Sequence, residues 1–300
     1  VAGSGGMGTV YEAVHHTLDA VAAVKILARR LASSLSHRKR FLYEARASSQ
    51  IRHPGLVSIF DYGILSDGTP YIMMERLHGR LLRACMAACP EGRLPLARGL
   101  GFGRQIAVAL AAAHEAGIIH RDLKPENVML VPGAEPDDGE RVRILDFGIA
   151  KFLRAPEPHT LPSQQPMGTP TYMSPEQCRN EREIDARSDV YSLGILLYEM
   201  LCGKTPFAVD LADPMRVVFC HVFADPRPPR ELWPDIPIEV GDLLLRMLSK
   251  APERRPHMSE VAAELGKLIS ELSATGVMPA LISGTPLARQ RLMPALLLLL

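Results

Sequence analysis

Residues 119–127, with the sequence IHRDLKPEN, constrain this chain more than any other segment. They place Asp122, Lys124 and Asn127 within six positions, and Pro125 keeps them off a helix because its ring removes a backbone donor and fixes φ. Asp122 can accept the proton of an attacking hydroxyl, Lys124 can neutralise a phosphoryl group, and Asn127 offers a carbonyl oxygen to a hard cation. These groups suit phosphoryl transfer, so we interpret the segment as a catalytic loop; the alternative is a polar loop of coincidental composition.

Composition limits the class of protein to which such a loop belongs. The 300 residues are 47% apolar and 22% charged, which suits a chain with one large core or two unequal lobes. A formal charge of +1 gives no field that would attract nucleic acid, so we expect no nucleic-acid partner. The five cysteines include no C-x-x-C pair, which favours a reduced, cytoplasmic protein whose cysteines hold no metal. Glycines near the start interrupt any apolar run there and predict no signal peptide.

The first strand-like segment follows a glycine pattern, GSGGMGTV, at residues 3–10. In dinucleotide-binding folds such glycines open a helix, whereas here they run into an alternating strand over residues 10–14. We therefore predict a hairpin whose backbone amides close over phosphates. A plain turn between two edge strands is the alternative.

A lysine inside an apolar strand needs an anionic partner, because desolvation disfavours its charged form. Lys25 lies in such a strand, predicted over residues 21–27. A helix predicted over residues 38–51 carries on one face Phe41, Ala45 and Ser48. Glu44 lies beside that face and is the expected counter-ion, which would leave Lys25 able to hold the α and β phosphates of a nucleotide. Alternatively, Glu44 pairs with Arg40 on the same helix.

Periodicity divides the rest of the chain into a strand-rich and a helical part. Strands are predicted over residues 56–62, 71–74, 128–130 and 142–145, and helices over 98–117, 188–201, 240–248 and 261–272. We expect a small lobe over residues 1–77 and a larger lobe over residues 78–270, with a ligand between them. Asp146 ends a strand and precedes Phe147 and Gly148, a placement that suits a magnesium ligand.

The tail, residues 271–300, ends in the apolar run LMPALLLLL. These nine residues are too few to cross a bilayer, which needs about 20. They could begin a span that continues as an anchor, with Arg289 and Arg291 on the cytoplasmic side; the alternative is a short unstructured end.

Taken in order, these motifs resemble the protein kinase family, in particular the bacterial, eukaryotic-like serine/threonine protein kinases. The resemblance covers about residues 1–270 and rests on GxGxxGxV, AxK, the helix glutamate, HRDLKPEN, DFG, GTPxYxxPE, DVYSLG and PxxRP. It implies a bilobal α+β fold, Mg-ATP as the phosphoryl donor, with Mn²⁺ as an alternative ion, and serine or threonine hydroxyls of proteins as acceptors.

The resemblance also implies roles for individual residues. Asp122 would be the catalytic base, Lys124 would steady the transferring group, and Asn127 and Asp146 would bind magnesium. Lys25 and Glu44 would form an ion pair. The nucleotide would contact Gly3, Ser4, Gly5, Gly6, Met7, Gly8, Val10, Ala23, Lys25, Met74, Glu75, Leu77 and Leu130. Structural roles would belong to Arg121, Glu176, Asp189 and Arg255, with Glu176 and Arg255 paired.

Residues 149–175 show no clear periodicity and resemble an activation loop. Arg121 precedes the base, as in kinases switched by loop phosphorylation, where the guanidinium clamps a phosphate. Ser163 and Thr160 are the candidate sites, and the alternative is that they are ordinary loop hydroxyls. Lys124 together with Thr169 is the serine/threonine pattern rather than the tyrosine one.

The chain departs from the family pattern in three places. It begins almost at the glycine pattern, Ser48 stands where a bulkier apolar residue is usual, and Ser174 replaces an alanine. Rival functions are a pseudokinase scaffold, disfavoured because every catalytic group is present, and a small-molecule kinase, disfavoured by the GTPxYxxPE segment. We expect protein substrates, self-association for autophosphorylation, and membrane attachment only if the tail continues as an anchor.

Overall fold

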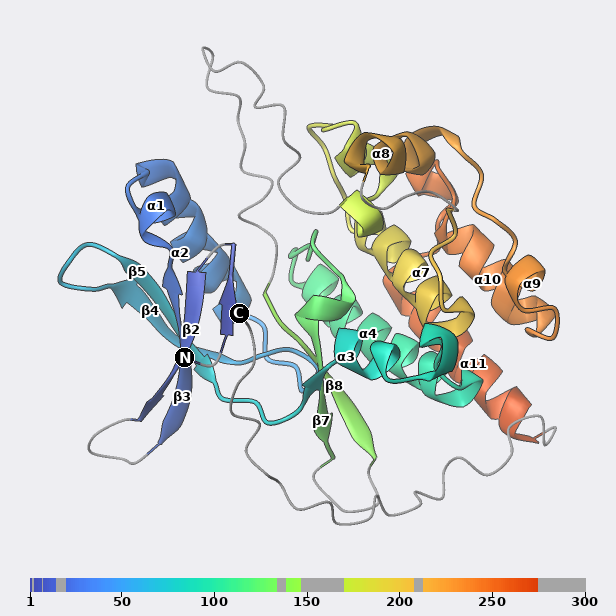
Figure 1. Cartoon of the computed structure of the whole chain (residues 1–300), viewed down its shortest axis with the longest axis horizontal. Coiled ribbons are helices and arrows are strands. Elements are labelled where there is room, and N and C mark those ends of the chain that lie inside the picture. Colours follow the sequence, from blue (N-terminus) through green and yellow to red (C-terminus); the bar gives the residue numbers. More distant parts are fainter. Residues whose placement is uncertain are drawn as a thin grey trace.

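A computed structural model of the chain describes residues 1, 3–6, 8–14, 20–133, 139–146, 170–207 and 213–274. Within these residues an antiparallel sheet with two helices lies on one side of a larger helical part, and a smaller sheet lies between them (Figure 1). The expected bilobal α+β architecture is therefore confirmed.

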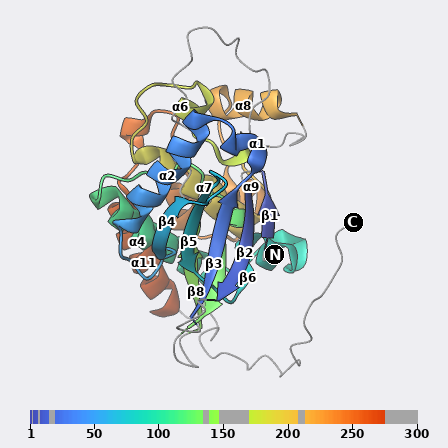
Figure 2. The same ribbon diagram turned by 90° about the vertical axis from the view of Figure 1, so that its left-hand side faces the viewer.

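The small lobe is built on a five-stranded sheet with the order β1-β2-β3-β5-β4. Its strands are β1 (Gly3–Gly5), β2 (Gly8–Val14), β3 (Val21–Leu27), β4 (Ile59–Ile64) and β5 (Pro70–Glu75). The helix α2 (Leu35–Ser49), preceded by α1 (Arg29–Ala32), packs against β4 and β5 (Figure 2). Their shared core consists of Leu27, Phe41, Ala45 and Ile72.

Several element boundaries in this lobe differ from the sequence prediction, and two of them differ by three residues. α2 begins at Leu35 rather than residue 38, because Ser34 caps the helix with its hydroxyl oxygen 3.5 Å from the amide of His37. β4 begins at Ile59 rather than residue 56, because Leu56 and Val57 pair instead with Ile144, whose carbonyl accepts the Val57 amide at 3.0 Å. A contact with a distant strand thus overrides the local strand pattern.

The larger lobe combines a small sheet with packed helices. The sheet contains β6 (Arg80–Leu81), β7 (Val128–Pro132) and β8 (Glu140–Ile144). The α-helices are α3 (Leu82–Ala87), α4 (Leu96–Glu115), α6 (Pro175–Cys178), α7 (Arg187–Cys202), α8 (Pro214–Phe223), α9 (Pro229–Leu232), α10 (Ile238–Met247) and α11 (Met258–Ala274). Single 3-10 turns are η1 (Pro90–Gly92), η2 (Pro125–Asn127), η3 (Pro170–Tyr172) and η4 (Pro252–Arg254).

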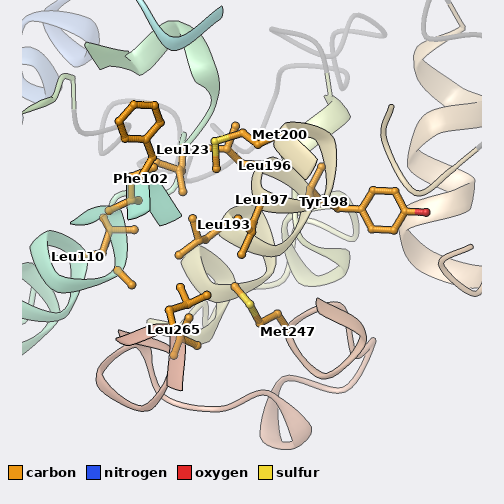
Figure 3. Packing of buried hydrophobic residues seen from close by; sticks show 14 of the residues in the cluster. Phe102, Leu110, Leu123, Leu193, Leu196, Leu197, Tyr198, Met200, Met247 and Leu265 are labelled. Atoms are coloured by element: carbon orange, nitrogen blue, oxygen red, sulfur yellow. The ribbon is translucent and has the colours of Figure 1, made fainter. Parts of the chain in front are cut away.

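The helix α7 is the centre of the main core. Its sequence is apolar on nearly every face, as expected for a buried helix, and Leu193 and Leu197 have no exposed surface. In Figure 3, side chains of α7 lie among Leu110 of α4, Met247 of α10 and Leu265 of α11. Because three helices pack around it, α7 gives the lobe a rigid frame to which polar loops can be anchored.

The last described helix, α11, ends near the start of the predicted tail. α11 continues to Ala274, past the boundary predicted at residue 270, and residues 275–300 lie outside the described part of the chain. Among the residues described, we find no helix with the length and apolar character needed to cross a bilayer. The division into lobes at residue 77 stays a prediction; β5 ends at Glu75 and β6 begins at Arg80.

Two glycines with the same backbone conformation allow a matched test of packing at the end of α7. Gly117 and Gly203 both have φ of 74°, but a Cβ on Gly203 would lie 2.3 Å from the carbonyl oxygen of Glu91, whereas one on Gly117 would meet nothing within 4 Å. We expect Gly117→Ala to lower the free energy of unfolding by roughly 1–2 kcal/mol through strain alone. Gly203→Ala should cost about 1–3 kcal/mol more through the clash. Urea unfolding of both variants measures the difference, and equal losses would contradict it.

Candidate active site

The glycine pattern forms a tight hairpin at the edge of the five-stranded sheet. β1 and β2 pair antiparallel, with Gly3 opposite Val10 and Gly5 opposite Gly8. The strand β2, rather than a helix, directly follows the pattern, which excludes the dinucleotide-binding arrangement. That the hairpin closes over phosphates, rather than being a plain turn between two edge strands, stays a prediction. Gly8 must be glycine because a Cβ there would lie 2.1 Å from the carbonyl oxygen of Ile26. Met7 and the side chain of Ser4, both predicted to contact the nucleotide, lie outside the described residues.

The strand registers place several predicted nucleotide contacts on one face of the sheet. Val10 is opposite Lys25 across β2 and β3, and Ala23 is opposite Met74 across β3 and β5. Residues directly opposite in a sheet share a face, as do residues two apart on one strand such as Ala23 and Lys25. Leu130, on β7 of the other sheet, is buried. The small lobe thus presents one lysine among apolar side chains.

Lys25 joins the two lobes through an ion pair. It is only 6% exposed, and its Nζ lies 2.7 Å from Oδ1 of Asp146, the residue that follows Leu145 after β8. The structure therefore brings together two of the groups that sequence analysis assigned to one site. The side chains of Glu44, its predicted counter-ion, and of Arg40 lie outside the description, so that prediction stays open to test.

The catalytic loop has the compact form that its residue types suggest. Lys124 Nζ lies 3.2 Å from Asp122 Oδ2. The side-chain amide of Asn127 donates to the backbone carbonyl of Asp122 at 2.9 Å and to its Oδ2 at 3.2 Å. These contacts hold the Asp122 carboxylate between an ammonium and an amide, and they turn the carbonyl oxygen of Asn127 away from that carboxylate.

The loop is also attached to the strand that leads to Asp146. The backbone amide of Leu145 donates to the backbone carbonyl of Asn127 at 2.8 Å. The imidazole Nε2 of His120 lies 3.0 Å from the backbone carbonyl of Leu145. Asp146 has φ of 37°, a left-handed conformation that is uncommon for residues other than glycine. Asn127 and Asp146 are therefore held on neighbouring, hydrogen-bonded segments.

The carboxylate of Asp189, near the start of α7, holds the catalytic loop through hydrogen bonds. Asp189 has no exposed surface, and its carboxylate accepts the amides of His120 and Arg121 at 2.8 Å each. Its Oδ2 also lies 2.8 Å from Nε2 of His114. Burial acts to raise the pKa of Asp189, but these partners favour the charged form more and hold the pKa below its usual value. The resemblance implied a structural role for Asp189, and its three contacts connect α7 to the catalytic loop and to His114 of α4.

Arg121 has a left-handed backbone conformation, with φ of 63°. Its backbone contacts both α7 and α6. Its amide donates to Asp189, and its carbonyl accepts the side-chain amide of Gln177 at 2.8 Å. Burial lowers the pKa of the guanidinium, and the nearby carboxylate of Asp189 opposes this effect only in part. Thr160, Ser163 and Thr169, the predicted loop hydroxyls, lie outside the described residues.

The predicted contact between Glu176 and Arg255 is present as a buried, bidentate ion pair. Arg255 Nη1 lies 2.7 Å from Oε1 of Glu176, and Nη2 lies 2.9 Å from Oε2. The guanidinium also donates to the backbone carbonyls of Arg187, Ser249 and Lys250. These bonds join α6, α7 and the segment around η4. The pair therefore fixes α6 beside the catalytic loop, and we call residues 170–178, which contain η3 and α6, the platform.

Ser174, which departs from the family pattern, has a clear structural role. It is fully buried and caps α6 in a reciprocal arrangement with Gln177. Its hydroxyl also lies 2.9 Å from that of Ser188 at the start of α7. The hydroxyl of Ser174 therefore takes part in two hydrogen bonds within the core, with the amide of Gln177 and the hydroxyl of Ser188.

The connection between the lobes contains a residue that sequence reasoning missed. Arg143 of β8 forms an ion pair with Glu75 and donates to the carbonyl of Pro54 at 2.8 Å. Glu75 also accepts the amide of Ser58 at 2.6 Å, and Leu77 offers its carbonyl to Arg76. The only sequence signal was a charged residue alternating with apolar ones in β8. Arg143 therefore links Glu75, a predicted nucleotide contact, to the strand that leads to Asp146.

The oxygen ligands at this site fit a divalent cation that keeps most of its own water. Among the described residues no group of three or more histidine, cysteine or carboxylate side chains could hold a metal ion. The chain instead offers the carbonyl oxygen of Asn127 and the carboxylate of Asp146, whose side chain is 44% exposed. Mg²⁺ is usually bound by one or two protein ligands together with phosphate oxygens and water, which this pair satisfies.

Comparison with known proteins agrees with this geometry. The family described as protein kinase domain matches residues 1–265. The chain is 40% identical to the serine/threonine-protein kinase pkn3 of Myxococcus xanthus over 263 residues, which cover 86% of this chain and 47% of that protein. It is 37% identical to the probable serine/threonine-protein kinase PknB of Corynebacterium glutamicum, covering 89% of this chain and 41% of that protein. The chain thus spans less than half the length of these relatives.

A solved structure shows the same architecture. The crystal structure of the PknI kinase domain of Mycobacterium tuberculosis superposes with a TM-score of 0.69 and 26% identity, covering 89% of this chain and 93% of that one. The likeness therefore extends over both lobes rather than over one motif.

The buried ion pair behind the loop gives a test of what holds the platform in place. Arg255→Met leaves the Glu176 carboxylate, whose side chain is 3% exposed, without its partner, and we expect the free energy of unfolding to fall by about 3–5 kcal/mol. Arg246→Met is the matched control, because its pair with Glu264 is partly exposed and should contribute about 1 kcal/mol or less. Chemical denaturation measures both. A loss for Arg255→Met no larger than that of the control would contradict the assigned role.

Proposed function

Because the chain belongs to the protein kinase family, we propose that it transfers the γ-phosphoryl group of Mg-ATP to serine and threonine hydroxyls of proteins. The observation that carries the proposal is the meeting of two charged groups on different sheets: Lys25 of β3 contacts Asp146 after β8, next to the loop that holds Asp122 and Asn127. Phosphoryl transfer requires mainly positioning and charge neutralisation, and these groups supply both.

Each polar side chain has one task in this proposal. Asp122 accepts the proton of the acceptor hydroxyl, and its contacts with Lys124 and Asn127 orient its carboxylate. Lys124 neutralises charge on the transferring group, and Lys25 holds the donor phosphates. Asn127 and Asp146 would hold Mg²⁺, or Mn²⁺ in its place, and the bound ion would neutralise charge that develops on the phosphate oxygens.

The nucleotide base would lie against the apolar face described above. Val10, Ala23 and Leu130 would enclose the adenine, and Met74 would lie at its inner end, with backbone groups of Glu75 and Leu77 forming hydrogen bonds to it. The hairpin of Gly3, Gly5, Gly6 and Gly8 would cover the phosphates; in the structure it stands at the edge of the same sheet.

Two rival functions make different demands. A pseudokinase would lack one of Lys25, Asp122, Asn127 or Asp146, and all four are present. A small-molecule kinase would not need the platform that Glu176 and Arg255 fix beside the loop. Transfer of labelled phosphate from ATP to a generic basic protein, but not to a sugar-like alcohol, distinguishes the proposed function from the second rival.

Regulation and location follow from the same resemblance. We propose that Ser163 or Thr160 becomes phosphorylated by a second copy of the chain, and that Arg121 then binds the phosphate. The free state of all five cysteines favours a reducing, cytoplasmic setting for the domain. Attachment to a membrane would require the tail to continue as an anchor.

Replacing the proposed base tests the chemistry. Asp122→Asn keeps a side chain able to accept the hydrogen bond from Asn127 but removes the proton acceptor. We expect ATP affinity to stay within about twofold, while single-turnover phosphoryl transfer falls by roughly 10²–10⁴-fold. Asp242→Asn on the exposed face of α10 is the control and should change neither quantity. Equal single-turnover rates for Asp122→Asn and the wild type would remove Asp122 from the role.

Autophosphorylation is tested separately by mapping phosphorylated residues after incubation with Mg-ATP. We expect modification of Ser163 or Thr160, and loss of activation in the Ser163→Ala/Thr160→Ala double variant. Arg121→Gln should abolish activation without preventing the modification. An active enzyme with neither residue modified would contradict the proposal.

A further inference from the structure

The tip of the hairpin formed by β1 and β2 contacts an arginine from the helix that follows β3. Arg30 of α1 donates from Nη2 to the backbone carbonyl of Gly6, which lies between β1 and β2. The strand register accounts for this contact. Gly8, the first residue of β2, is opposite Leu27, the last residue of β3, and α1 begins two residues later. The chain therefore leaves β3 beside the hairpin tip, and Figure 2 shows α1 at this end of the sheet.

Within the described residues the hairpin tip has little other support. β1 is an edge strand, so its backbone pairs with β2 alone. A Cβ on Gly3, Gly5 or Gly6 would meet nothing within 4 Å, so these glycines are not closely packed. Glycine loses more backbone entropy on ordering than any other residue. A hairpin of this composition therefore needs a fixed partner if its amides are to point at a phosphate.

The helix α1 can serve as that partner because its own position is fixed. The backbone amides of Leu31 and Ala32 both donate to the carbonyl of Ala28, at 2.8 Å and 2.9 Å. The side chains of Leu31 and Ala32 pack against the core of the small lobe, to which α2 contributes. The bond from Arg30 to Gly6 therefore connects the hairpin tip to that core.

We propose that Arg30 is a positioning residue that holds the hairpin over the phosphates of the bound nucleotide. This inference rests on the proposed function, since it concerns the donor of that reaction. The guanidinium acts on the backbone of the hairpin rather than on the nucleotide itself. Its charge-assisted hydrogen bond restricts the tip before ATP arrives, so less entropy is lost when the nucleotide binds.

Nucleotide binding tests the proposal. Arg30→Ala should raise the Kd and the KM for Mg-ATP by about five- to tenfold, the effect of one exposed hydrogen bond, and should leave kcat within about twofold. Adenosine has no phosphates for the hairpin to cover, so its Kd should be the same for the variant and the wild type. Arg29→Ala is the matched control. It removes the same charge from the adjacent exposed position of α1, and it should bind ATP as the wild type does.

Hydrogen exchange in the nucleotide-free protein separates positioning from direct contact with a phosphate. Arg30→Ala should speed exchange of the backbone amides of residues 3–10 by about fivefold, because the hairpin opens more often without its partner. Exchange in β5 and α7 should not change, which shows that the variant is folded. An arginine that acted only on the phosphates would leave exchange in residues 3–10 unchanged.

The outcomes separate this inference from the proposed function. If Arg30→Ala binds ATP as the wild type does, or loses affinity for adenosine to the same extent, the inference is overturned while the function stands. Unchanged exchange in residues 3–10, or an equal loss of ATP affinity in Arg29→Ala, would also overturn it. If the wild type binds ATP but phosphorylates no protein, the proposed function fails, and the binding and exchange measurements still decide the inference.

Discussion

The buried carboxylate of Asp189 is the interaction on which the geometry of the site depends. The segment from His120 to Lys124 forms no regular secondary structure, so its amides need acceptors from elsewhere in the chain. Asp189 accepts two of them, from His120 and Arg121, while fully enclosed by the core. The left-handed backbone of Arg121 persists because those bonds over-determine it.

The same helix carries the other anchors of the larger lobe. Near its start the carbonyl of Arg187 accepts Arg255, and near its end Glu199 accepts both Arg83 and Tyr172. α7 is mostly apolar, and α4, α10 and α11 pack around it (Figure 3). Moving its polar groups would therefore require the hydrophobic core to open. The catalytic loop and the platform are therefore both attached to α7.

The small lobe is held to this frame by far fewer contacts. Its described core contains four buried residues, whereas the core around α7 extends through most of the larger lobe. The two lobes meet through polar contacts, Lys25 with Asp146 and Arg143 with Glu75, and through the backbone pairing of Val57 with Ile144. Apolar residues of the small lobe also join the core of the larger one, namely Leu56, Ala47 and Ile51.

The sequence by itself determined the chemistry of the site and the elements with strong local periodicity. The strand around Lys25, the buried helix after Asp189 and the loop from His120 to Asn127 could be predicted because side-chain period and residue type are local properties. Only the tertiary structure decided where β4 begins, what Arg143 links, and that Arg83 lies between Glu126 and Glu199, which are 43 and 116 residues away. Such pairings depend on which surfaces the folded core brings together, and no local pattern in the chain records that.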